Sequence, residues 1–207
     1  KETDKKLLNS PYAQFLKMTS EVRCLFKVGE KQHIATRLMG GILYAYGNQT
    51  VAPYSEQFYI GGANSIRAFT VRSIGPGSYR PEDKQYGYLD ETGDVKLEAN
   101  VEYRFPILGD LYGAAFLDAG NVWLLREQKN EEGEKIRPGG LLTLRNFAKS
   151  IALGTGVGLS YDLTFLVIRL DLGIALHDPY DTGKKGYYNI PKFKDGLGLH
   201  FAIGYPF

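Results

Sequence analysis

The chain has 207 residues and an almost balanced charge, with 25 Lys and Arg against 23 Asp and Glu and no block of basic residues. Nucleic acid is therefore not an expected partner. A transmembrane helix is excluded as well, because no run of about 18 apolar residues is present. Cys24 is the single cysteine and the three histidines are far apart, so neither a disulfide, a metal site nor a bound cofactor is expected.

Seven segments alternate between apolar and polar residues, the pattern of a β-strand with two different faces. The clearest is 95–105, where Val101 and its apolar neighbours alternate with charged or amide residues such as Glu102. The segments run to roughly 11–14 residues, whereas strands of soluble proteins average about 5–6 and a tilted membrane strand needs about 9–11. In chain order they are 16–28, 33–46, 95–105, 112–123, 151–161, 165–176 and 197–207.

The connections between these segments alternate strictly between short and long. Short ones lie around 29–30, at 106–110 and at 162–164, and long ones at 47–94, 124–150 and 177–196. An up-and-down barrel gives this order when the turns on one side of a membrane are tight and the loops on the other side are long. The sequence thus predicts an all-β, antiparallel up-and-down transmembrane β-barrel.

Seven strands are too few to close such a barrel. A membrane barrel leaves no edge facing lipid, and bacterial single-chain barrels have at least eight strands. We therefore expect residues 1–207 to be the C-terminal part of a barrel domain. The remaining strands would precede Lys1 or come from another chain.

The longest loop contains a motif that resembles the sixth extracellular loop of the BamA/TamA barrel-assembly family. Gly61-Gly62 precedes Ile66-Arg67-Ala68-Phe69, and the family hallmark is Val/Ile-Arg-Gly-Phe/Tyr after a Gly-Gly turn. Similar matches follow in order along the chain. They are Val101-Glu102-Tyr103-Arg104-Phe105-Pro106, Phe116-Leu117-Asp118-Ala119-Gly120-Asn121-Val122-Trp123, 150–158, Ile168-Arg169-Leu170-Asp171-Leu172-Gly173 and the aromatic ending Gly204-Tyr205-Pro206-Phe207.

The resemblance implies that the loop folds into the barrel lumen. Its arginine would be Arg67, and the acidic groups that pair with it would be Glu102 and Asp118 on the two following strands. Phe69 is the aromatic of the motif. Ala68 stands where the family usually has glycine. Because alanine tolerates positive φ poorly, the loop tip is not certain to have the family's usual backbone conformation.

The resemblance further implies a barrel of about sixteen strands, preceded by periplasmic substrate-binding repeats, in the outer membrane of a Gram-negative-type bacterium. The function implied is insertion of unfolded outer-membrane proteins into the bilayer through a seam that opens laterally, with accessory lipoproteins as further partners. The last strand, with Gly198, Gly204 and Phe207, would form one side of that seam.

Other classes of function account for the residues less well. Asp118, Asp162 and Asp171 lie on different strands without a histidine or cysteine pattern, so an enzyme is not expected. A polypeptide-secreting pore of the same superfamily and a passive porin-like channel remain alternatives, although a porin would lack the Arg67 motif. The other charged residues of segment 95–105 (Lys96, Glu98 and Arg104) are interpreted as a hydrated lumen, and the row Gly154, Gly156, Gly158 as either close loop approach or strand curvature.

Overall fold

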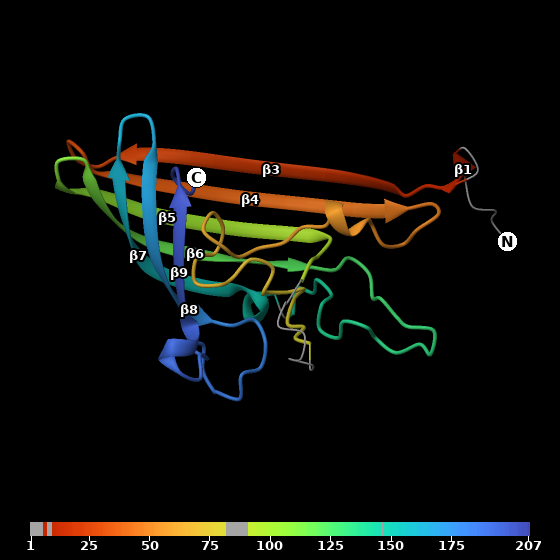
Figure 1. Ribbon diagram of the computed structural model, residues 1–207. Helices are drawn as coiled ribbons and strands as arrows, with labels where there is room; N and C mark the ends of the chain where they lie inside the picture. The colour runs from red at the N-terminus through yellow and green to blue at the C-terminus, as the bar shows by residue number, and fades with distance from the viewer. Residues whose placement is uncertain (1–5, 8–9, 82–90, 146) are drawn as a thin grey trace.

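The computed structural model describes residues 6–7, 10–81, 91–145 and 147–207 (Figure 1). It consists mainly of seven long strands. Two strands of two residues each pair near the start of the chain, and three short 3-10 helices are also present. Within the described residues, none of the helices has the length and apolar character needed to cross a membrane. The elements are β1 (Lys6–Leu7), β2 (Ser10–Pro11), β3 (Gln14–Lys27), β4 (His33–Tyr46), η1 (Tyr54–Glu56), β5 (Val95–Leu108), β6 (Leu111–Trp123), η2 (Ala148–Ser150), β7 (Ala152–Asp162), β8 (Val167–His177), η3 (Phe193–Gly196) and β9 (Leu197–Ile203).

The long strands form one antiparallel sheet in the order β3-β4-β5-β6-β7-β8-β9, so each strand pairs with its neighbours in the sequence. This is the predicted up-and-down topology, and β4 has the predicted bounds. The three tight turns gather at one end of the sheet and the three long loops emerge at the other (Figure 1). β3 and β9 form the two edges of this sheet.

The last strand is shorter than the sequence predicts. A strand over 197–207 was expected, but β9 ends at Ile203. Gly204 has a φ of 86°, which turns the backbone out of the extended conformation. Pro206 follows and has no N–H to donate to a ladder. Gly204 and Phe207 therefore lie beyond the strand that they were expected to belong to.

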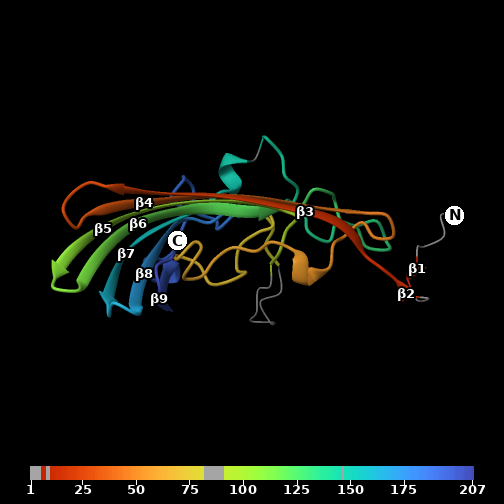
Figure 2. The ribbon, with the colours of Figure 1, turned by 90° about the horizontal axis from the view of Figure 1, so that it is seen from above.

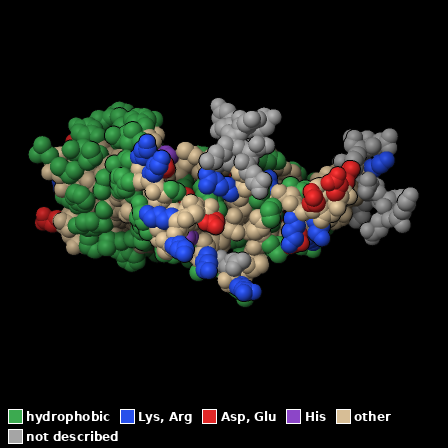
Figure 3. Space-filling view, turned by 90° about the horizontal axis from the view of Figure 1, so that it is seen from below, with side chains coloured by type: hydrophobic (Ala, Val, Ile, Leu, Met, Phe, Trp, Pro, Cys, Tyr) green, Lys and Arg blue, Asp and Glu red, His purple; other side chains and the backbone are tan. Residues whose placement is uncertain are grey.

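The two faces of the sheet reverse the arrangement of a water-soluble protein. Apolar side chains of the outer face are exposed, for example Leu38 at 54% and Val157 at 56%. Charged and amide side chains of the inner face are buried, with Glu98 and Asp118 both fully covered. Hydrophobic side chains concentrate over the half of the molecule that carries the short turns, and charged ones over the half with the long loops (Figure 3). Such an outer face suits lipid.

The described part of loop 47–94 lies on the concave side of the curved sheet, while η2 lies on the convex side (Figure 2). The loop has an apolar core of its own in which Phe58, Ile60, Ile66 and Ile74 are buried against Leu43 of β4. Loop and sheet therefore form one packed unit. Full burial of a large apolar side chain stabilises the folded state by roughly 1.5–3 kcal/mol.

Two neighbouring residues of β4 test which face meets the lipid. Leu38→Arg places a charge on the outer face and should cost about 2–4 kcal/mol near the bilayer midplane. Met39→Arg points to the inner face, where Met39 stands between Glu21 and Glu98 on the adjacent strands, and should cost much less. The measurement is reversible unfolding of the full-length protein in bilayers. Equal losses of stability from the two variants would show that the assignment of the faces is wrong.

Candidate functional site

The tip of the inserted loop is a tight double turn that presents Arg67 to the sheet. Gly61 and Gly62 have φ values of 96° and 92°, which favour glycine, and a Cβ on Gly61 would collide with the Thr70 carbonyl. The Gly62 N–H donates to the Phe69 carbonyl at 2.8 Å, and the Phe69 N–H donates to the Ile66 carbonyl at 3.1 Å. These bonds close the tip on itself.

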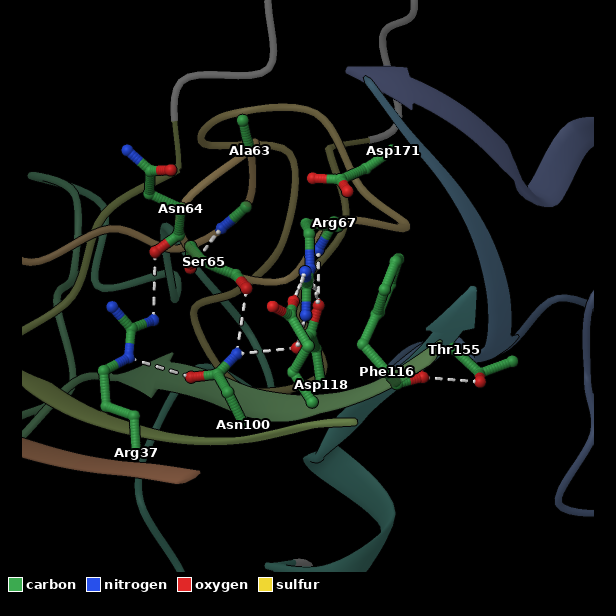
Figure 4. A network of polar contacts seen from close by, with 12 residues as sticks. Arg37, Ala63, Asn64, Ser65, Arg67, Asn100, Phe116, Asp118, Thr155 and Asp171 are labelled. Atoms are coloured by element: carbon green, nitrogen blue, oxygen red, sulfur yellow. Dashed lines mark hydrogen bonds and ion pairs between the residues drawn. The ribbon is translucent and has the colours of Figure 1, made fainter. Parts of the chain in front are cut away.

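Arg67 is completely buried between two carboxylates that come from neighbouring strands (Figure 4). Its Nε donates to Asp118 Oδ2 at 2.8 Å and its Nη2 donates to Asp118 Oδ1 at 3.0 Å, which is a bidentate pair. Its Nη1 donates to Glu102. The Arg67 backbone N–H also donates to Asp118 Oδ2, at 3.1 Å. β5 supplies Glu102 and β6 supplies Asp118.

The surroundings keep Arg67 charged. Burial alone would lower the pKa of Arg67, but the hydrogen bonds and the charges of Asp118 and Glu102 raise that pKa above its ordinary value. The guanidinium carbon also lies 3.5 Å from the centroid of the Phe116 ring, a cation–π contact from the same strand as Asp118. The arginine is thus enclosed by opposite charge on one side and an aromatic face on the other.

A second set of contacts holds the residues just before Arg67. Arg37 of β4 donates to the Asn64 carbonyl at 2.9 Å and to Asn100 Oδ1 at 3.0 Å, and it pairs with Glu98. Asn100 Nδ2 donates to the Ser65 carbonyl at 3.0 Å and to Asp118 Oδ1 at 2.9 Å. Asn100 therefore joins the two sets of contacts through hydrogen bonds (Figure 4).

A third set of contacts reaches the loop tip from the opposite side, from β8. Arg169 Nη2 of β8 donates to the Ala63 carbonyl and to Asn64 Oδ1, both at 2.8 Å. Its Nε lies 2.8 Å from Asp171 Oδ2 in a buried ion pair. The loop tip is consequently held from β4, β5, β6 and β8 together.

The expectation of a merely hydrated lumen beside Glu102 is wrong. Glu98 is fully buried and bonds to Ser65 Oγ at 2.9 Å, and Lys96 Nζ lies 3.0 Å from the same carboxylate. Arg104 Nε lies 2.6 Å from Glu102 Oε1. Alternation of residue types identifies the inner face but not which part of that face a loop covers, so these contacts were missed. The acidic residues of β5, opposite an arginine of the loop, were the signal for these contacts that the sequence offered.

Glycines on the inner face make room for the loop backbone. A Cβ on Gly173 would collide with the Arg67 carbonyl, and a Cβ on Gly198 would lie 2.9 Å from the same oxygen. Of the row Gly154, Gly156 and Gly158, only Gly154 faces the loop, at the methyl group of Ala68. Gly156 instead faces the Phe116 ring, and Gly158 faces the Asp171 carboxylate.

Ala68 fits this site without the positive φ that its replacement of glycine called into question. Among the described residues other than glycine, positive φ occurs only at Arg72 and Thr164. The Ala68 methyl is buried and points at Gly154, which has no Cβ of its own. The missing side chain on β7 therefore compensates for the extra methyl group in the loop.

The remaining residues singled out in the sequence lie around this centre. Phe69 packs against both apolar clusters of the loop region. Gly198 is in β9 beneath the loop, whereas Gly204 and Phe207 follow that strand. Over the described ranges, no group of three or more His, Cys, Asp or Glu side chains is arranged to hold a metal ion. Chemically, the site is a buried ion-pair network between a loop and a sheet.

Comparisons with known proteins agree on one family. The model of the Omp85 superfamily domain matches residues 9–207. The outer membrane protein assembly factor BamA of Neisseria meningitidis is 32% identical over 88 residues, which is 40% of this chain and 11% of that protein. The sorting and assembly machinery component 50 homolog A of Xenopus laevis is 31% identical over 165 residues, which is 78% of this chain and 32% of that protein.

A solved structure gives the same fold. BamA from Haemophilus ducreyi lacking POTRA domains 1-3 superposes with a TM-score of 0.60 at 16% identity, covering 92% of this chain and 35% of that one. This likeness supports the predicted barrel architecture. The chain spans about a tenth to a third of the length of these relatives.

A glycine substitution tests the close approach of the loop to the sheet. Gly173→Ala introduces a methyl group where the Arg67 carbonyl lies, and overpacking of this kind costs about 1–3 kcal/mol. Gly40→Ala is the matched control, because the nearest atom to a Cβ there is the Lys96 carbonyl oxygen at 4.0 Å. The measurement is the midpoint of urea unfolding of the full-length protein. Equal midpoints for the two variants would contradict the contact.

Proposed function

Because the chain belongs to the Omp85 superfamily, we propose that it is the C-terminal part of a transmembrane β-barrel that inserts outer-membrane proteins into the bilayer. We propose further that the pairing of Arg67 with Glu102 and Asp118 locks loop 47–94 inside the barrel. The observation that carries this proposal is a fully buried arginine bonded to carboxylates of two successive strands.

The energetics of burial support a lock. Moving a charge from water into a protein interior is expensive, and a partner carboxylate offsets that cost only when the geometry is good. Both carboxylate oxygens of Asp118 accept hydrogen bonds from the Arg67 guanidinium, and the Glu102 carboxylate accepts another. Withdrawing the loop would leave Asp118 on the inner face without its cation and Glu102 with Arg104 alone. The loop is thus stabilised in its inserted position by electrostatics as well as by its apolar core.

The lateral seam is the second part of the proposal. β9 is the last strand of the sheet and contributes only seven residues to it. A strand with an unpaired edge offers backbone donors and acceptors to an incoming strand, which is β-augmentation. A short β9 presents few ladder bonds for closure with the first strand of a complete barrel. Clients in an extended conformation would pair at this edge.

The proposed function also implies a complete barrel, a membrane and a set of partners. The complete barrel would have about sixteen strands, preceded by periplasmic repeats, and would lie in the outer membrane of a Gram-negative-type bacterium. Its partners would be the lipid bilayer, unfolded outer-membrane proteins and accessory lipoproteins. The site is proposed to act by holding and releasing protein segments and not by enzymatic chemistry.

Insertion is distinguished from secretion by a reconstituted assay. Purified full-length protein in liposomes should accelerate the folding of an added unfolded outer-membrane protein into those liposomes. The readout is the protease-protected, heat-modifiable form of the client. Translocation of a polypeptide into the liposome lumen without membrane folding would instead identify a secretion pore. Passive flux of small solutes alone would identify a porin-like channel.

Removing the arginine tests the lock. Arg67→Ala leaves Asp118 buried without its cation and Glu102 with Arg104 alone, and loss of one partner of a buried pair typically costs about 3–5 kcal/mol. The variant should loosen loop 47–94 and impair growth in a depletion strain while the strand content stays nearly unchanged. Arg67→Glu should be worse, and adding Glu102→Arg should recover part of the function. The measurements are complementation and protease accessibility of the loop in the full-length protein.

Arg72→Ala is the matched control for that experiment. Arg72 belongs to the same loop, but its guanidinium bonds to the Tyr54 hydroxyl and lies over the exposed rings of Tyr54 and Tyr59, not between Glu102 and Asp118. This variant should grow normally and keep the loop protected. Normal growth of Arg67→Ala, with the loop as protected as in the unmodified protein, would reduce Arg67 to an ordinary loop residue.

A further inference from the structure

The Glu102 carboxylate is shared between two arginines that lead to different parts of the chain. One oxygen pairs with Arg67 of the loop, and the other accepts a bond from Arg104 Nε at 2.6 Å. Arg104 reaches further, because its Nη2 donates to the Phe207 carbonyl at 3.3 Å. Its guanidinium carbon lies 4.4 Å from the centroid of the Tyr205 ring. A single side chain thus bridges Glu102 and the segment after β9.

A second arginine makes a parallel link. The Arg37 guanidinium carbon is 5.2 Å from the centroid of the Phe207 ring, and the same group donates to the Asn64 carbonyl of the loop tip. The Phe207 ring therefore lies within reach of Arg37 and Arg104 alike, at 5.2 and 5.8 Å. Both arginines are on the inner face, so segment 205–207 lies inside the curve of the sheet.

The backbone explains how this segment reaches the inner face. The Gly204 N–H donates to the Val167 carbonyl at 2.8 Å, which anchors the end of β9 to the start of β8. The φ of 86° at Gly204 then directs the chain away from the line of the strand. Pro206, which is buried, cannot continue a ladder. Segment 205–207 is consequently free to contact arginines instead of a neighbouring strand.

We propose that Arg104 is a positioning residue that couples the seat of the inserted loop to the position of segment 205–207 at the end of the last strand. The inference rests on the proposed function, in which β9 forms one side of the seam. When Arg67 leaves Glu102, that carboxylate attracts Arg104 alone and weakens its contacts with Tyr205 and Phe207. Release of segment 205–207 in turn frees Arg104 from Tyr205 and Phe207 to pair more closely with Glu102, which then depends less on Arg67. Loop withdrawal and loosening of the strand end therefore favour each other, as linkage requires.

Hydrogen exchange of the full-length protein in bilayers tests the coupling, followed in peptides covering 58–72 and 201–207, the second chosen to leave out Gly198 and His200, which lie against the loop. Arg67→Ala should speed exchange at 201–207 about tenfold, which corresponds to about 1.4 kcal/mol. In an Arg104→Gln background the same Arg67→Ala change should add no further exchange at 201–207. Faster exchange confined to 58–72 in Arg67→Ala would overturn the proposal.

Two further variants guard against a general loss of folding. Arg104→Lys keeps a cation beside Glu102 but loses the fork that spans Glu102 and Phe207, so exchange should rise at 201–207 and stay near normal at 58–72. Arg126→Gln removes an arginine that contacts Ala45 and Tyr44 away from both segments, and should leave both peptides unchanged. Unchanged exchange at 201–207 in Arg104→Lys would contradict the bridge. Normal growth of Arg67→Ala together with coupled exchange would refute the proposed lock and leave the coupling intact.

Discussion

A guanidinium ion that has lost contact with water needs its counter-charges around it, and that requirement organises the inner face of this sheet. Arg67 is fully buried, and its donors are met by Asp118 and Glu102 from adjacent strands and by the ring of Phe116. Carboxylates in these positions would repel each other if the arginine were absent. The loop and the sheet are therefore complementary in charge, and neither arrangement is favourable alone.

The shape of the inner face is set by the same need to enclose Arg67. The arginine reaches its partners only if the loop backbone comes very close to β8 and β9, and Gly173 and Gly198 provide that space. Ala68 adds a methyl group that Gly154 accommodates from the opposite strand. Apolar packing of Ile60 and Ile66 in one cluster with Leu43 of β4 adds to the attachment of the loop. An inserted loop held by both charge and packing has few alternative positions, which fits the proposed function, in which the seam is the part that moves.

Strand periodicity and loop lengths were sufficient to predict the topology, because a period of two and an alternation of turn lengths are properties of the sequence itself. The pairing of Arg67 with Glu102 and Asp118 was expected only through the family resemblance. The contacts of Arg37, Glu98 and Arg169 were missed, since they depend on where the loop tip lies against strands that are 27 to 106 residues away in the chain. The early end of β9 was missed as well. Alternation continues through Tyr205 and Phe207, although Gly204 and Pro206 interrupt the ladder.

A double-mutant cycle between Arg67 and Asp118 tests the central claim most directly. Stability of the full-length protein would be measured by reversible urea unfolding in bilayers for Arg67→Ala, for Asp118→Ala and for the two changes combined. A buried bidentate pair predicts that the double variant is more stable than the sum of the single losses implies, by about 1.5–3 kcal/mol. Single losses that add to within about 0.5 kcal/mol would show that the two groups do not depend on each other.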